Sequence, residues 1–380
     1  MRVGVCIFNA NYSDWDRFEA EEADQGVPGS PSVPDHQVFR EDLGFAIEAE
    51  RLGYDTIWTI EHHFTPYGME TNPLQYLTYI AGVTKRVDVG SMVVVLPWHN
   101  PVRVAEDVNM LQLFLGENRR VIAGVGRGLA RREFQGLGID QNESRSRFNE
   151  SLLIVRDLLR DGRITFHGEH FDLDNVRLRP QPERDLSDQL WCAAGSPETL
   201  EIQAKYNVSP LIIPNTDLDT ALQGVQHYMG LRGQYGFGPT NTKLSIYIYV
   251  AETEEEAREG IGYLRNYGMS VVRHYELLAN YHKDLKGYER YASIGAALQG
   301  QAEPYMSIFE GQPWGTPEKV LEQISVLGEK FGASEIMGVF RFGGMPLDKA
   351  QKNLRLFAEK VLPGLHAQNF EPLPVAVAAS

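Results

Sequence analysis

Cysteine is nearly absent from this chain. Only two of its 380 residues are cysteines, Cys6 and Cys192, and each lies inside a short apolar run. Thiols in such surroundings behave as small buried hydrophobic groups and are typical of a reducing compartment. We therefore do not expect a fold held together by disulfides.

Basic residues are fewer than acidic residues, and the chain has no long apolar run. Lys and Arg number 36 against 51 Asp and Glu, which gives a formal net charge of −15. This charge repels polyanions, so nucleic acid is excluded as a partner. No apolar run approaches the length of a membrane span, and the N-terminus enters a strand without a charged leader and apolar segment. We expect a cytoplasmic protein that does not bind a membrane.

Eight short runs rich in β-branched residues recur along the chain. The segments between them have the apolar spacing of amphipathic helices, and this alternation predicts a parallel sheet. Eight such units close most naturally into a TIM-like (β/α)8 barrel, which we expect to be a single domain over residues 1–372. A doubly wound open sheet is the competing fold, but no Gly-x-Gly-x-x-Gly follows the first strand. The expected strands are Val3–Phe8, Asp55–Ile60, Val87–Leu96, Arg120–Gly126, Leu190–Ala194, Pro210–Pro214, Lys243–Val250 and Glu335–Phe340.

Three insertions interrupt this alternation. Residues 10–35 are rich in Gly, Pro and acidic residues, which predicts a long loop over the barrel mouth, acting as a lid or merely solvated. Residues 166–182 alternate polar and apolar side chains and predict a hairpin. Residues 281–317 separate two helices and are either a shield over a ligand or disordered. Residues 373–380 are small and apolar, which predicts a flexible tail.

Metal binding has little support in the sequence. His167 and His170 in the predicted hairpin resemble a metal pair, but no further cysteine or histidine lies close by, and such histidines are more often surface or packing residues. We therefore expect no metal site.

Two adjacent histidines follow the second expected strand. The apolar run ending at Ile60 continues directly into Glu61, His62 and His63. Titratable side chains at the C-terminal end of a barrel strand are typical of an active site, because the strand is rigid and the following loop carries the chemistry. On these residues alone, one histidine could equally cap the barrel through hydrogen bonds.

Glycines surround an arginine after the fourth expected strand. Gly124, Gly126 and Gly128 would let the backbone approach a ligand, and Arg127 offers a planar cationic fork to an anion. Glycines also relieve crowding where strands turn, so the pattern is weak by itself.

A second candidate for anion binding follows the fifth expected strand. Gly195, Ser196 and Thr199 would offer backbone N–H groups, hydroxyls and the positive end of a helix to a phosphate. Ordinary N-capping by Ser196, with Pro197 at the first helical position, is the alternative. Together with Arg127, these residues predict a phosphorylated cofactor.

Several longer motifs lie at the strand ends and in the last part of the chain. They are Glu61–Thr65, Gly90–Pro97, Asn100–Asn109, Gly126–Leu129 with Glu133 and Phe134, Val339–Met345 and Leu356–Pro363. Together they resemble bacterial luciferase α subunits and the wider luciferase-like flavin monooxygenases. The resemblance implies a TIM-like barrel that binds reduced FMN, which reacts with oxygen to a flavin C4a-hydroperoxide and oxygenates a small organic substrate. In the light-emitting members that substrate is an aldehyde.

The resemblance also implies roles for individual residues. His62 corresponds to the histidine with a base role, and His63 would be a second catalytic or supporting residue. Arg127, Ser196 and Thr199 correspond to phosphate contacts. In addition, Glu133 would lie near the flavin ring, Gly126 replaces a reactive cysteine, Gly195 replaces an acidic residue, and Met92 and Val93 would be joined by a cis peptide bond beneath the ring.

The resemblance further implies partners. No nicotinamide fingerprint is visible, so reduced flavin would come from a separate NAD(P)H:flavin reductase. A homodimer is expected, formed through the helices beside the second and third strands. The alternatives are an oxidoreductase that uses the deazaflavin F420 and a non-catalytic flavin-binding protein. The longer 10–35 segment and Trp98-His99 depart from luciferase near the mouth, so the substrate stays open.

Overall fold

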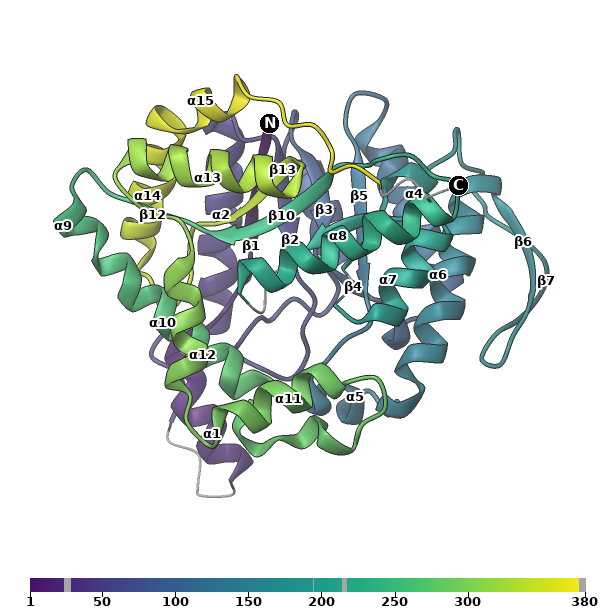
Figure 1. Cartoon of the computed structure of the whole chain (residues 1–380), viewed down its shortest axis with the longest axis horizontal. Coiled ribbons are helices and arrows are strands. Elements are labelled where there is room, and N and C mark those ends of the chain that lie inside the picture. Colours follow the sequence, from purple (N-terminus) through teal and green to yellow (C-terminus); the bar gives the residue numbers. More distant parts are fainter. Residues whose placement is uncertain (24–28, 194, 214–216, 376–380) are drawn as a thin grey trace.

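A closed ring of eight parallel strands forms the centre of the computed structural model, which describes residues 1–23, 29–193, 195–213 and 217–375 (Figure 1). The ring runs β1, β2, β3, β5, β8, β9, β10 and β13, and the pairing of β3 with β5 closes it. The predicted barrel is therefore confirmed, although the expected strand ends at Ala194 and Pro214 lie outside the described residues. The strands are β1 (Arg2–Ile7), β2 (Thr56–Thr59), β3 (Asp88–Ser91), β5 (Val121–Gly126), β8 (Leu190–Ala193), β9 (Ser209–Ile212), β10 (Thr242–Tyr247) and β13 (Ala333–Val339).

The strands read as nearly unbroken apolar runs because both of their faces are covered. All residues of β2, β3, β5 and β10 are buried. Inside the barrel, Trp58 donates from Nε1 to Glu335 Oε1 over 3.0 Å, and Lys243 Nζ lies 2.5 Å from Glu335 Oε2. Burial alone would raise the pKa of Glu335, but Lys243 and Arg2 outweigh it and lower that pKa. The buried charge is thus compensated.

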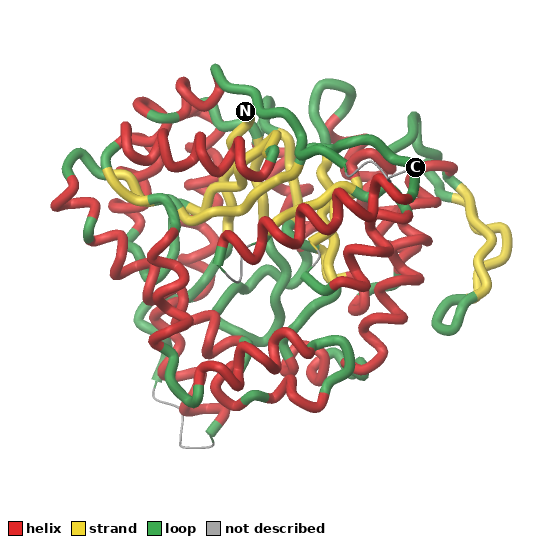
Figure 2. Tube along the Cα trace, in the orientation of Figure 1, coloured by secondary structure: helices red, strands yellow, loops and turns green. Residues whose placement is uncertain are grey.

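Helices surround the barrel as an outer layer (Figure 2). Local sequence signals fix the ends of several of them. Asn72 and Asn100 accept backbone N–H groups at the starts of α3 (Pro73–Val83) and α4 (Pro101–Leu115), each of which has proline at its first position. The remaining main helices are α2 (Asp35–Leu52), α6 (Ser144–Asp161), α7 (Pro197–Lys205), α8 (Leu218–Gln234), α10 (Glu259–His274), α13 (Pro317–Phe331), α14 (Leu347–Lys360) and α15 (Leu362–His366). None of the helices in the described part of the chain combines the length and apolar character needed to cross a bilayer.

The first two insertions differ in how well the sequence predicted them. The hairpin is confirmed, with antiparallel strands β6 (Arg163–His167) and β7 (Asp172–Arg177), and it projects from one side of the molecule (Figure 1). The prediction of a loop over 10–35 is wrong for Trp15–Glu22, which forms helix α1. Trp15 is buried in the core, which stabilises a helix that the acidic composition does not suggest.

The third insertion is helical. It contains α11 (Glu289–Leu298) and α12 (Glu303–Ile308), and α12 packs against α10. The disordered alternative is therefore wrong. At the chain end, Leu373 packs against the core, and residues 376–380 lie outside the described part.

Candidate active site

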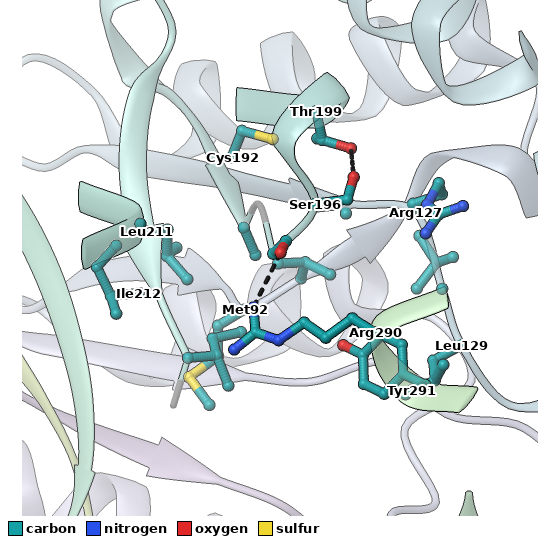
Figure 3. A pocket seen from close by; sticks show the side chains of 18 of the residues that line it. Met92, Arg127, Leu129, Cys192, Ser196, Thr199, Leu211, Ile212, Arg290 and Tyr291 are labelled. Carbon is teal, nitrogen blue, oxygen red and sulfur yellow. Dashed lines mark hydrogen bonds between the residues drawn. The ribbon is translucent and has the colours of Figure 1, made fainter. Parts of the chain in front are cut away.

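The C-terminal ends of the barrel strands surround a cavity of about 580 Å³ (Figure 3). This volume lies within the range of cofactor and substrate pockets, which is roughly 300–1,000 Å³. Nine of the ten predicted site residues line the cavity, and His63 is the exception. The nine are His62, Met92, Val93, Gly126, Arg127, Glu133, Gly195, Ser196 and Thr199.

One end of the cavity is cationic and rich in hydroxyls. Arg127 Nη2 donates to the Gly287 carbonyl over 2.5 Å, whereas its buried Nη1 has no hydrogen-bond partner in the described part of the chain. Ser196 and Thr199 lie beside Arg127 with their hydroxyl oxygens 3.0 Å apart (Figure 3). Ser196 lies at the N-cap of α7 with Pro197 at the first helical position, but its side chain makes no capping bond in the described structure. The Thr199 and Leu200 N–H groups donate to the Ser196 carbonyl over 3.1 and 3.0 Å, and the Ser196 hydroxyl contacts Thr199 and Arg145 instead.

Two further arginines reach this end, and sequence reasoning missed both. Arg145 on α6 donates to Ser196 Oγ over 3.4 Å and to the Gly287 carbonyl over 3.3 Å. Burial, followed by the nearby charge of Arg127, lowers the pKa of Arg145. Arg290 on α11 donates to the Gly195 carbonyl over 2.9 Å (Figure 3). A phosphate fits between these arginines and hydroxyls. It would relieve the repulsion between Arg127 and Arg145 and give Nη1 of Arg127 a hydrogen-bond acceptor.

A histidine and a carboxylate form the second polar group of the cavity. His62 Nδ1 lies 2.8 Å from Oε1 of Glu133, and the same oxygen accepts the His63 backbone N–H over 2.9 Å. Glu133 lies on the short helix α5 (Arg131–Gly136) and is only 1% exposed. The carboxylate therefore fixes the orientation of the His62 ring, whose Nε2 is not engaged by Glu133.

The His63 side chain contacts Glu61, which lines the cavity although His63 itself does not. His63 Nε2 lies 3.1 Å from Glu61 Oε1, His99 Nε2 lies 2.6 Å from the same oxygen, and the Val95 N–H donates to Oε2 over 2.7 Å. Burial would raise the pKa of Glu61, but the hydrogen bonds from His63 and His99 outweigh it and lower that pKa. These contacts fit the supporting role expected for His63 better than direct catalysis.

Close packing explains two of the glycines. The peptide bond between Met92 and Val93 is cis, as expected from the resemblance. A Cβ at Gly126 would come within 2.6 Å of Val93 Cγ2, and one at Gly124 would come within 2.0 Å of the Ser91 carbonyl oxygen. Both glycines are needed to relieve crowding, so Arg127 alone carries the prediction of an anion site at this loop.

Aromatic side chains form the other end of the cavity. They come from β10 and α10, from the residues directly after β1 and α10, from the loop after β2 and from the third insertion. No local motif therefore identified them. The hydroxyls of Tyr67 and Tyr267 are 2.6 Å apart, and the ring centroids of Tyr247 and Tyr267 are 4.2 Å apart. Burial raises the pKa of all three phenols well above the usual value, so they stay neutral. The full set is Phe8, Tyr67, Tyr247, Tyr267, Tyr275 and Phe309.

His274, at the end of α10, also reaches the His62–Glu133 pair, and no sequence signal pointed to it. Its Nε2 lies 3.7 Å from Glu133 Oε1, and its ring stacks on Tyr67 with centroids 4.5 Å apart. Burial, followed by His62 and Arg132, lowers the pKa of His274 well below its usual value, so the ring is neutral.

A cavity at the C-terminal ends of the strands of a (β/α)8 barrel is the place where enzymes of this fold carry their active sites. The chain belongs to the luciferase-like monooxygenase family, whose model matches residues 1–335. It is 27% identical over 328 residues to an alkanal monooxygenase alpha chain of Photorhabdus luminescens, which covers 83% of this chain and 89% of the relative. Membership of this family supports an oxidoreductase.

Solved structures share the fold over nearly the whole length. The oxygenating component of 3,6-diketocamphane monooxygenase from Pseudomonas putida, in complex with FMN, superposes with a TM-score of 0.68 at 18% identity and covers 99% of this chain and 100% of its own. An F420-dependent secondary alcohol dehydrogenase bound to an F420–acetone adduct gives a TM-score of 0.68 at 17% identity, covering 96% and 98%.

Proposed function

We propose that this protein is the oxygenase of a two-component system that uses reduced FMN and O2 to oxygenate a small organic substrate. The observation that carries the proposal is the cationic end of the cavity, where Nη1 of the partly buried Arg127 has no hydrogen-bond partner among the described residues and lies near Arg145, Ser196 and Thr199. When bound, reduced FMN would supply the electrons that activate O2.

The family favours FMN over F420, because both the family model and the Photorhabdus luminescens relative are monooxygenases. Gly287 and Arg290 from the third insertion lie against the cationic end through bonds to Arg127 and Gly195. FMN ends in a phosphate monoester, whereas the phosphate of F420 is a diester that continues into a further acidic chain.

His62 and Glu133 are the proposed proton-transfer pair. The bond from Nδ1 to Glu133 Oε1 leaves Nε2 of His62 as the nitrogen that accepts or releases a proton in the cavity. Imidazole suits this role near neutral pH. Met92 and Val93 line the cavity with apolar side chains, against which a flavin ring would lie, and the aromatic end would receive an apolar substrate.

The third insertion is the proposed barrier to water. Arg131 on α5 pairs with Glu276, five residues before this segment, over 2.5 Å, and lies over the ring of Tyr281 at its start, 5.1 Å from the centroid. Tyr291 and Phe309 from the insertion line the cavity. Excluding water couples the use of oxygen to product, whereas water access favours release of hydrogen peroxide.

The proposed partners are a separate flavin reductase and a second copy of the chain. Tyr79 and Val83 on α3 are exposed and lie four residues apart, as do Met110 and Phe114 on the neighbouring helix α4. Exposed apolar side chains gathered on adjacent helices are typical of a subunit interface. We therefore propose a homodimer formed through α3 and α4.

Anaerobic titration with reduced FMN, reduced riboflavin and reduced F420 tests the cofactor assignment. We expect reduced FMN to bind most tightly, because riboflavin has no phosphate and F420 extends beyond it. Tighter binding of F420 than of FMN would contradict the proposal and favour hydride transfer without oxygen.

A further inference from the structure

Three groups of the kind that bind transition metals converge on one point beside the cavity. They are His62 after β2, Glu133 on α5 and His274 at the end of α10, and one ligand atom from each lies within 4.8 Å of the other two. His62 Nδ1 is 2.8 Å and His274 Nε2 is 3.7 Å from Glu133 Oε1. Two imidazoles and a carboxylate form a recurrent donor set for a zinc ion that keeps an open position.

His274 supplies an independent sign that a ligand belongs here. Its side chain is fully buried, and none of the described residues forms a hydrogen bond with its Nε2. The ring cannot easily turn away, because Nδ1 contacts Thr65 Oγ1 at 3.2 Å and the ring stacks on Tyr67 at an interplanar angle of 6°. An unpartnered buried polar atom is rare in proteins and calls for an explanation. A metal ion on Nε2 provides one.

The distances suit a zinc ion after small side-chain movements. Zinc binds histidine nitrogen at about 2.0–2.1 Å and carboxylate oxygen at about 2.0–2.2 Å, so tetrahedral ligand atoms lie roughly 3.4 Å apart. The observed separations of 2.8 and 3.7 Å lie on either side of this value. The nearby cation Arg132 is paired with Glu22 over 3.1 Å, which reduces its opposition to a metal ion.

We propose that His62, Glu133 and His274 form a zinc site that switches the enzyme off. Without zinc, the proton of His62 lies on Nδ1 and bonds Glu133 Oε1. Zinc takes this position between the two atoms, and the proton of His62 moves to Nε2. A histidine in this state cannot accept a proton in the cavity. His62 and Glu133 line the cavity, so water would fill the fourth position of the metal. The site rests on geometry alone, whereas the inhibition rests on the proposed function.

Titration of Zn²⁺ into the full-length, cofactor-free protein, in competition with a chromophoric chelator, tests the site directly. We expect one Zn²⁺ per chain. His274→Phe keeps an aromatic ring against Tyr67 but removes the ligand, and should weaken binding by more than about 100-fold, beyond the 10- to 100-fold typical of lost supporting contacts. His167→Ala, which removes an exposed histidine beside Asp172 on the hairpin, should leave binding unchanged. Glu133→Gln provides a second ligand variant should His274→Phe fail to fold.

The outcomes separate this proposal from the proposed function. No Zn²⁺ uptake, equal binding by wild type and both ligand variants, or loss of binding in His167→Ala would overturn the site. Zn²⁺ should also inhibit oxygenation by the wild type near its dissociation constant, and His274→Phe should need over 100-fold more Zn²⁺ for the same inhibition. Binding as expected without any FMN-dependent oxygenation would keep the site and contradict the proposed function.

Discussion

Replacing Glu133 by glutamine removes a negative charge from the active site and keeps the side-chain shape. In the wild type, Glu133 Oε1 accepts from His62 Nδ1 over 2.8 Å and from the His63 N–H over 2.9 Å. Hydrogen bonds to charged groups contribute about 1.5–3 kcal/mol. If that stabilisation serves the transition state, its loss slows product formation by about 10- to 150-fold, since 1.36 kcal/mol corresponds to a factor of ten.

The assay is the single-turnover rate of product formation after the complex with reduced FMN is mixed with O2 and substrate. Binding of reduced FMN should change little in Glu133→Gln, because the proposed phosphate contacts lie at the other end of the cavity. A double-mutant cycle with His62→Gln gives a sharper test, since residues that act as a unit are not additive. We expect the double variant to be scarcely slower than His62→Gln alone. Additive losses, or an equal loss of flavin affinity, would refute the coupling of the two residues.

Four further changes test other parts of the structure. Arg127→Ala should weaken binding of reduced FMN by about 10- to 150-fold, because it removes a charge-assisted hydrogen bond. Its affinity for riboflavin, which has no phosphate, should stay unchanged. Equal losses of affinity for both flavins in a fluorescence titration would count against a phosphate contact. Burial raises the pKa of Glu70 to about 8 in the folded protein. As the pH rises from about 4.5 to 8, the unfolded chain releases this proton while the folded chain still holds it, so the stability of the wild type should fall over this range. Glu70→Gln should abolish that fall in melting temperature, and an unchanged slope would contradict it. Phe114→Glu should produce monomers in analytical ultracentrifugation, whereas Val326→Glu, at a similarly exposed position on α13, should not; dimers in both would exclude α4 from the interface. Arg131→Ala removes the side chain that pairs with Glu276 and lies over the ring of Tyr281 at the start of the third insertion. It should raise the ratio of hydrogen peroxide to product, and unchanged coupling would remove the insertion as the barrier to water.

The barrel could be predicted because its strands are buried on both faces. Such strands read as continuous apolar runs, and the runs containing Trp58 and Val125 are examples. The candidate site was predictable where a residue directly follows a strand, as His62 and Arg127 do, because all strand ends of a parallel barrel meet at one mouth. Helix α1 was missed because its stability comes from burial of Trp15, a tertiary contact that its composition does not show.

The missed residues lie on helices and insertions, where sequence distance hides spatial proximity. Arg145 sits in the first turn of α6 and resembles any surface arginine until α7 brings Ser196 to it. His274 ends a helix more than two hundred residues after His62. His63 shows the opposite problem, because two adjacent histidines look equivalent in sequence although only His62 lines the cavity. Side-chain direction after a strand depends on local backbone angles that a single sequence does not reveal.

The most direct test of the account follows oxygen atoms under ¹⁸O2. The protein would be supplied with FMN, NADH and a flavin reductase and offered a panel of alkanals and aromatic compounds, and the products would be analysed by mass spectrometry. We predict one ¹⁸O atom in the product and the second in water, with labelling abolished in His62→Gln. Absence of label in every product, together with oxygen-independent turnover of a secondary alcohol with F420, would contradict it.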